Sequence, residues 1–277
     1  MTHVSDELIE LGSLRFHFRD WTASSPDAPV LVLLHGYTGH ARSWDAFAQA
    51  MTDRYRVLAL DQRGHGETQW AAANAYSTDD MTGDLRAFVA ALGLKQFALL
   101  GLSMGGSVAI RYAGAQPAEL SKLVIVDIGP ELVTEGLNRI QTSVRAADVF
   151  DSRDQAFAAA RGNNPRAPEL HLRHRIWNGL MLTGDGRWTY RYDRALRDPG
   201  NPRPRLSAEE NWHSWNRIAV PTLLVRGGES DLLSPQIAQR MMRENSKASR
   251  IDVAGAGHSV PLDQPDGFLL AVREFLS

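Results

Sequence analysis

One serine of the chain lies in a setting that favours nucleophilic chemistry. Ser103 stands between two glycines in the segment 101–105, which reads Gly-Leu-Ser-Met-Gly. The apolar run 97–100 before it predicts a buried strand, and residues 105–112 after it predict the start of a helix. A serine on such a sharp strand-to-helix turn projects its hydroxyl above the sheet. Glycines flank it because side chains there would collide with the neighbouring strand and helix. We therefore interpret Ser103 as a nucleophile.

A serine hydroxyl is a weak nucleophile at neutral pH, so it needs a general base, and the base needs an acidic residue to orient it. Two polar residues are candidates for these roles. Asp231 and His258 each lie in a glycine-containing loop that follows a predicted strand, at 222–225 and 250–253 respectively. Because parallel strands end at the same edge of a sheet, we expect both side chains to lie near Ser103.

A second carboxylate is an alternative for the acid. Asp127 directly follows the strand predicted over residues 123–126, so it also lies at a strand end. The loop that contains Asp231 has a second interpretation, because Ser234-Pro235 is typical of a helix start and the loop would then only lead into that helix.

The elements that must position these residues alternate along the chain. A hairpin is predicted to turn at Gly12-Ser13, and continuous apolar runs then predict strands at 30–34, 56–60, 97–100, 123–126, 222–225 and 250–253. Helices are predicted between and after them, near 41–51, 78–92, 235–244 and 265–275. Buried strands that alternate with amphipathic helices indicate a mainly parallel sheet covered on both faces.

The segment 130–217 breaks this alternation. It contains helical stretches, one hairpin-like piece and four of the seven tryptophans of the chain, at 177, 188, 212 and 215. We interpret it as a mainly helical cap over the carboxyl edge of the sheet, inserted into a core formed by residues 1–129 and 218–277. Ligands of open α/β sheets bind at that edge. The residues that we expect to line a substrate pocket beneath the cap are Trp44, Trp177, Met181, Leu182 and Val260.

Composition excludes several other classes of function. A formal net charge of −2 gives no reason to expect a nucleic acid or an anionic membrane as partner. The chain has no cysteine, which excludes disulfides, thiol catalysis and thiolate metal sites. Neither a signal peptide nor an apolar run long enough to span a bilayer is visible, so we expect a cytoplasmic protein with no membrane partner.

Five short motifs lie along the chain: His35-Gly36, Asp61-Gln62-Arg63-Gly64-His65-Gly66, Gly101 to Gly106, Gly228 to Asp231, and Gly257-His258. Together they resemble the α/β-hydrolase superfamily, and most closely its small bacterial carboxylesterases and enol-lactonases. The resemblance implies the α/β-hydrolase fold, with a mostly parallel eight-stranded sheet flanked by helices and a mainly helical cap after the sixth strand. It also implies a serine mechanism that needs no cofactor and no metal.

The resemblance implies roles for individual residues. In this fold the nucleophile, the acid and the histidine follow one another along the chain, which places the acid at Asp231 and leaves Asp127 as the alternative. The backbone N–H groups of Tyr37 and Met104 are expected to form the oxyanion hole. Dehalogenases and epoxide hydrolases of this fold carry aspartate where this chain has Ser103, so those two chemistries are disfavoured.

The expected activity is hydrolysis of a small-molecule carboxylic ester or lactone by two-step acyl transfer. Three alternatives use the same residues or the same fold. One is a hydrolase that cleaves C–C bonds in ring-cleavage diketones, and another is a cofactor-free haloperoxidase or perhydrolase. The third is a receptor that binds a small molecule and barely turns it over.

Overall fold

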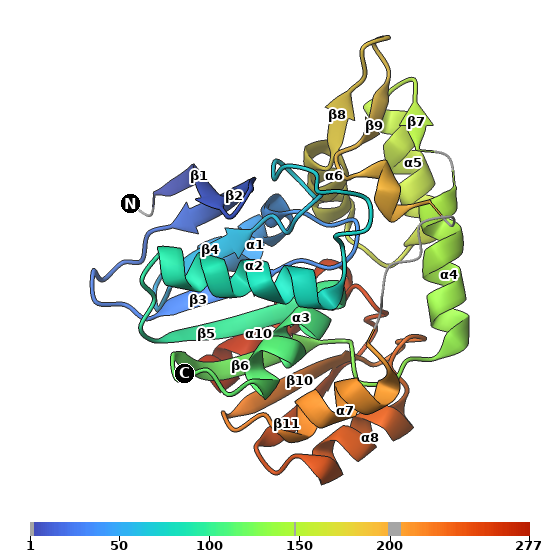
Figure 1. Ribbon diagram of the computed structural model, residues 1–277. Helices are drawn as coiled ribbons and strands as arrows, with labels where there is room; N and C mark the ends of the chain where they lie inside the picture. Colours follow the sequence, from blue (N-terminus) through green and yellow to red (C-terminus); the bar gives the residue numbers. More distant parts are fainter. Residues whose placement is uncertain (1–2, 147, 199–205) are drawn as a thin grey trace.

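The structure is a computed structural model, and it describes residues 3–146, 148–198 and 206–277. Eight strands form one sheet in the order β1-β2-β4-β3-β5-β6-β10-β11 (Figure 1). The pairings of β1 with β2 and of β2 with β4 are antiparallel, and the rest are parallel. The strands are β1 (Val4–Leu11), β2 (Leu14–Trp21), β3 (Val30–Leu34), β4 (Arg56–Leu60), β5 (Phe97–Leu102), β6 (Leu120–Val126), β10 (Thr222–Gly227) and β11 (Ala248–Val253).

Helices cover both faces of this sheet because successive strand residues point to opposite sides. Val32 and Leu34 of β3 pack into one buried cluster, and Leu31 and Leu33 pack into the other. The first face is covered by α2 (Thr78–Ala91), α3 (Met104–Gly114), α7 (Ala208–Asn216) and α8 (Pro235–Glu244). The second is covered by η1 (Ala41–Trp44), α1 (Asp45–Met51) and α10 (Pro265–Leu276), with the short α9 (Val260–Asp263) before the last.

Local sequence signals fix where several of these helices begin. Ser77 caps α2 and forms a reciprocal capping box with Asp80. The Ser234 side chain accepts a hydrogen bond from the Ile237 N–H at the start of α8, which has proline in its first turn. The predicted core strands and helices are confirmed, with bounds that differ by a few residues at most.

A second group of elements lies to one side of the main sheet (Figure 1). A separate three-stranded antiparallel sheet has the order β7-β9-β8. Its strands and the neighbouring helices are α4 (Thr134–Arg145), β7 (Val149–Phe150), α5 (Arg153–Asn163), α6 (Glu169–Asn178), β8 (Leu180–Leu182), β9 (Trp188–Tyr190) and η2 (Arg194–Leu196). These elements have their own small buried cluster, which includes Phe150, Leu172 and Ile176. They lie within the segment predicted to be a cap.

Helix α7 also falls within that predicted segment, but it packs against the core helices. A Cβ on Gly114 of α3 would lie 2.6 Å from the Ser214 carbonyl oxygen of α7. The indole N–H of Trp215, fully buried, donates to the Met241 carbonyl oxygen of α8 at 2.9 Å. Two of the four tryptophans in the segment, Trp212 and Trp215, therefore belong to the core cluster. Among helices in the described residues, none is long and apolar enough to cross a membrane.

Candidate active site

Ser103 occupies the strained turn that the sequence predicts between β5 and α3. Its backbone has φ 52° and ψ −116°, in a region that residues with a side chain rarely adopt. A Cβ on Gly101 would lie 2.3 Å from the Gly105 carbonyl oxygen, and one on Gly105 would lie 2.6 Å from the Leu34 carbonyl oxygen. The turn is this tight because strand and helix are in direct contact, and both flanking positions therefore require glycine.

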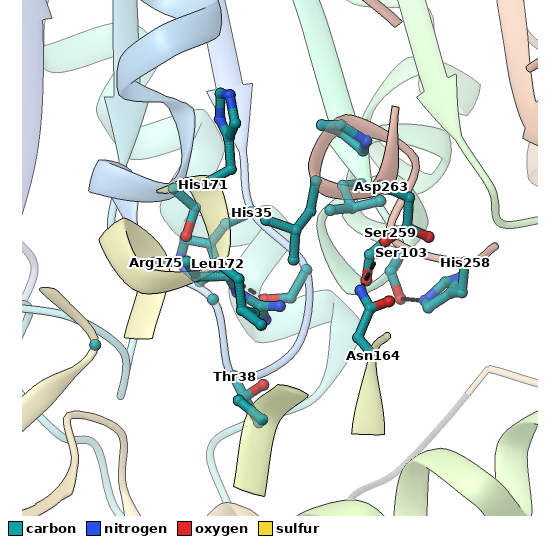
Figure 2. A pocket seen from close by; sticks show the side chains of 18 of the residues that line it. His35, Thr38, Ser103, Asn164, His171, Leu172, Arg175, His258, Ser259 and Asp263 are labelled. Carbon is teal, nitrogen blue, oxygen red and sulfur yellow. Dashed lines mark hydrogen bonds between the residues drawn. The ribbon is translucent and has the colours of Figure 1, made fainter. Parts of the chain in front are cut away.

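His258 bridges Ser103 and a carboxylate. Its Nε2 lies 2.9 Å from Ser103 Oγ (Figure 2). Its Nδ1 lies 2.8 Å from Asp127 Oδ2. The carboxylate fixes the proton on Nδ1, which leaves the Nε2 lone pair free to accept the serine proton. The three residues follow the strand ends of β5, β6 and β11, at the same edge of the sheet.

Asp127 is held firmly in this position. Its side chain is completely buried, and its backbone φ is 49°. Oδ1 accepts a hydrogen bond from the Gly227 N–H at 2.9 Å, and Oδ2 accepts one from the Ser230 hydroxyl at 2.5 Å, besides the contact with His258. These hydrogen bonds hold the carboxylate in place and orient it toward the imidazole.

The prediction that Asp231 orients His258 is wrong in this structure. The Asp231 carboxylate forms a bidentate pair with Arg139, at 2.5 and 2.7 Å, and its side chain is 45% exposed. The hydrogen bond from Arg139 lowers the pKa of Asp231. The physical reason is the course of the loop after β10, which directs Ser230 inward to Asp127 and leaves Asp231 on the exposed side beside Arg139.

The predicted oxyanion donors lie in two loops that meet beside Ser103. Met104 is the first residue of α3, where an N–H has no acceptor within the helix. A Cβ on Gly36 would lie 3.3 Å from the Ser103 Cβ, so the loop that continues into Tyr37 runs directly against the nucleophile. Tyr37 also lines the pocket. Its role and that of Met104 as donors stay predictions.

His35 has a structural role, because its ring joins two loops beside the site. The Gln62 N–H donates to its Nε2 at 3.0 Å, and its Nδ1 donates to the Gly36 carbonyl oxygen at 2.8 Å. Burial lowers the pKa of His35 to about 4, so the ring is neutral at neutral pH. It therefore ties the loop of Gly36 to the loop after β4.

A pocket of about 630 Å³ opens beside Ser103 and His258. Of the predicted wall residues, Trp44 lines it, whereas Trp177, Met181, Leu182 and Val260 do not. Trp177 and Leu182 are exposed on the outer surface, where Arg173 stacks on the Trp177 ring at 5.3 Å. The reason is that Trp177 lies beside Arg173 on the exposed side of α6, and that Met181 and Leu182 lie beyond the end of this helix at Asn178, in β8. Val260 is fully buried in the core.

Other residues of α6, not predicted from the sequence, line the pocket. They lie on the inner face of the helix and include Leu172, Arg175 and Ile176. This face is fastened to the core, since His40 Nε2 donates to the Arg175 carbonyl oxygen at 2.8 Å. The signal available in the sequence was the apolar pair Leu172 and Ile176, spaced four residues apart.

The model of the family described as "Alpha/beta hydrolase family" matches residues 31–271, and the chain therefore belongs to this family. A 3-hydroxybutyrate-oligomer hydrolase of Cupriavidus necator is 28% identical over 276 residues, covering 95% of this chain and 94% of that protein. Esterase Rv0045c of Mycobacterium tuberculosis is 28% identical over 260 residues, covering 90% of this chain and 83% of that protein.

Solved structures show the same fold. The crystal structure of E-2-(acetamidomethylene)succinate hydrolase superimposes with a TM-score of 0.88, at 23% identity and 99% coverage of both chains. The expected α/β-hydrolase fold and the resemblance to its esterase-like members are therefore confirmed. The protein is a hydrolase of this family.

Proposed function

We propose that this hydrolase cleaves a small-molecule carboxylic ester or lactone by acyl transfer through Ser103. The observation that carries the proposal is the position of His258, within 2.9 Å of Ser103 Oγ and 2.8 Å of Asp127 Oδ2. The presence of an esterase and a 3-hydroxybutyrate-oligomer hydrolase among the relatives supports this choice of substrate.

The first half of the reaction transfers the acyl group to the enzyme. Ser103 Oγ attacks the ester carbonyl carbon while His258 Nε2 takes the hydroxyl proton. Asp127 stabilises the imidazolium that forms, and the Tyr37 and Met104 N–H groups stabilise the negative oxygen of the tetrahedral intermediate. The intermediate collapses as His258 gives its proton to the departing alkoxide, which leaves an ester on Ser103.

The second half releases the acid. A water molecule attacks the acyl-serine while His258 takes one of its protons, and the C–O bond to Ser103 then breaks with return of that proton to Oγ. We propose that the elements α4 to η2, within the segment 130–217, act as a cap that selects the substrate. The contribution of Leu172 and Ile176 to the pocket supports this role.

The test is hydrolysis of 4-nitrophenyl esters from acetate to hexanoate, with small lactones in parallel. We expect turnover by the wild type and a loss of about 10⁴-fold or more for Ser103→Ala. Ser107→Ala, one helical turn further along α3, is the matched control and should retain activity. Equal activity of Ser103→Ala and the wild type would overturn the serine mechanism.

A further inference from the structure

Arg175 is a charged side chain in the pocket for which the described part of the chain supplies no counterion. It lies on the inner face of α6 and lines the same cavity as Ser103 and His258. Figure 2 shows Arg175 and Leu172 on one side of the pocket, with Ser103 and His258 on the other. Within residues 3–146, 148–198 and 206–277, no carboxylate forms an ion pair with the Arg175 guanidinium and no group accepts a hydrogen bond from it.

Two further arginines of the pocket wall, Arg139 and Arg166, differ from Arg175 in that each pairs with a carboxylate. Arg139 is neutralised by its bidentate pair with Asp231. Arg166 pairs with Glu229, with Nη2 2.9 Å from Oε2. Both pairs are about half exposed, so water screens their charges. Arg175 is more enclosed than either, since it is half-buried whereas Arg139 and Arg166 are exposed, and this burial lowers the pKa of its guanidinium.

Within the described ranges, none of the groups near Arg175 forms an ion pair with it. Asp263 attracts it electrostatically, but the carboxylate oxygens of Asp263 accept hydrogen bonds from Asn164 Nδ2 at 2.6 Å and from the Gly257 N–H at 2.9 Å. Tyr190 and Tyr192 also lie close enough to interact with Arg175. Among the described residues, neither tyrosine hydroxyl has a hydrogen-bond partner.

Enclosing a cation without a counterion is unfavourable, and an anion that binds beside it compensates the charge. A guanidinium remains charged at neutral pH and presents parallel N–H groups that match the two oxygens of a carboxylate. The two tyrosine hydroxyls add neutral donors in the same part of the pocket. Arg175, Tyr190 and Tyr192 together therefore favour the binding of a planar anion, in a part of the pocket away from Ser103.

We infer that Arg175 binds a free carboxylate of the substrate, so that the enzyme acts on esters that carry a carboxylate in addition to the ester group. This inference rests on the proposed ester hydrolysis, because it places the second functional group of the same substrate. Arg175 binds and positions the substrate, whereas Ser103 and His258 carry out the chemistry.

The test compares matched substrates with and without the charge. One series uses 4-nitrophenyl hydrogen glutarate and its methyl-capped ester, which place the carboxylate on the acyl side. The other uses 4-acetoxybutyrate and its methyl ester, with release of acetate as the readout, which place it on the alcohol side. The variant is Arg175→Met, which keeps the length of the side chain and removes the charge.

We expect the wild type to prefer the anionic substrate in one of the two series. Arg175→Met should lower kcat/KM for that substrate by about 10- to 100-fold, which is the range for a lost hydrogen bond to a charged group. The kcat/KM for the methyl-capped substrate, which has no carboxylate for Arg175 to bind, should stay the same. Arg175→Lys should retain part of the preference. Arg173→Met is the matched control, because Arg173 lies on the outer face of α6 and pairs with Asp154 and Glu169.

Two results would overturn the inference while leaving the serine mechanism intact. One is hydrolysis with no preference for the anionic substrate in either series, and the other is an equal preference in Arg175→Met and the wild type. If no ester is hydrolysed, the proposed function fails, and calorimetry with glutarate on Ser103→Ala protein then decides. Binding that disappears with Arg175→Met supports the carboxylate site, and no binding overturns it.

Discussion

Asp127 and His258 lie 131 positions apart in the chain, yet their side chains meet with 2.8 Å between Oδ2 and Nδ1. Asp127 follows β6 and His258 follows β11, and β10 separates these strands in the sheet. The contact therefore spans the width of one intervening strand. The Gly227 N–H at the end of that strand donates a hydrogen bond to the Asp127 carboxylate.

The first prediction separates the two candidate acids. Asp127→Asn should lower kcat by roughly 10⁴-fold, because an amide at this position favours the wrong imidazole tautomer and cannot stabilise the imidazolium. Asp231→Asn should change kcat by less than about threefold, since its loss breaks only an exposed pair with Arg139. Steady-state kinetics on a 4-nitrophenyl ester provides the measurement. An inactive Asp231→Asn variant together with an active Asp127→Asn variant would show that Asp231 is the acid, as the sequence predicts.

The second prediction concerns the nucleophile and its base. Ser103→Ala and His258→Ala should each lose on the order of 10⁴-fold or more in kcat, and the double variant should be scarcely worse than either. The losses do not add because both residues serve one proton-coupled attack. Additive losses in the double variant would mean that the two residues act in separate steps.

The third prediction concerns stability at acidic pH. Burial lowers the pKa of both His35 and His40 to about 4, below the ordinary 6.5 of the unfolded chain. The stability that these neutral rings contribute is therefore complete above about pH 6.5 and is lost as the pH falls toward 4. At pH 5 the loss is on the order of 2 kcal/mol for each ring.

Denaturant unfolding at pH 7.5 and pH 5 measures this loss. His40→Gln should show a smaller decrease than the wild type, because an amide can donate to the Arg175 carbonyl oxygen and does not titrate. His17 acts in the opposite direction: burial disfavours its charged form, but the hydrogen bonds from its ring to Asp61 and Asp6, together with the negative charges of Asp61 and Glu67, outweigh burial and raise its pKa. Its contribution is lost only as the pH rises through that raised value, above 6.5. If the free energy of unfolding decreased between pH 7.5 and pH 5 by the same amount in His40→Gln and in the wild type, the lowered pKa of His40 would be contradicted.

The fourth prediction concerns the turn that carries Ser103. Gly105→Ala should lower the free energy of unfolding by on the order of 2–3 kcal/mol, because its Cβ would lie 2.6 Å from the Leu34 carbonyl oxygen. Gly83→Ala is the matched control, since Gly83 is an exposed residue of α2 with no atom within 4 Å of an added Cβ. It should stabilise the protein by about 0.5–1 kcal/mol. Equal effects of both substitutions would show that the turn is looser than described.

The positions of Ser103 and His258 follow from local patterns, because apolar runs fix the strand ends and glycines mark the loops. The identity of the acid does not follow from local patterns, because Asp127 and Asp231 come after the neighbouring strands β6 and β10 and both lie at the carboxyl edge of the sheet. Which of them reaches the histidine depends on how the loop after β10 turns, and there Ser230, not Asp231, faces inward. A residue that directly follows its strand, as Asp127 does, is held by the sheet itself.

The walls of the pocket were the least predictable part of the site. Large apolar side chains occur both in pockets and in cores, and Val260 belongs to the core. The inner face of α6 depends on where that helix ends and how it is fastened to the core. The hydrogen bond from His40 to the Arg175 carbonyl oxygen fastens it, and this contact crosses 135 positions of the chain.

The rate at which a fluorophosphonate labels Ser103 tests the central claim most directly, because the reagent needs only an activated serine and no knowledge of the substrate. Intact-mass spectrometry follows the rate, and peptide mapping identifies the labelled residue. We expect rapid labelling of Ser103 in the wild type and in Asp231→Asn, and labelling slower by at least about 100-fold in Asp127→Asn and His258→Ala. Labelling of another residue, or equal rates in the wild type and Asp127→Asn, would contradict the account.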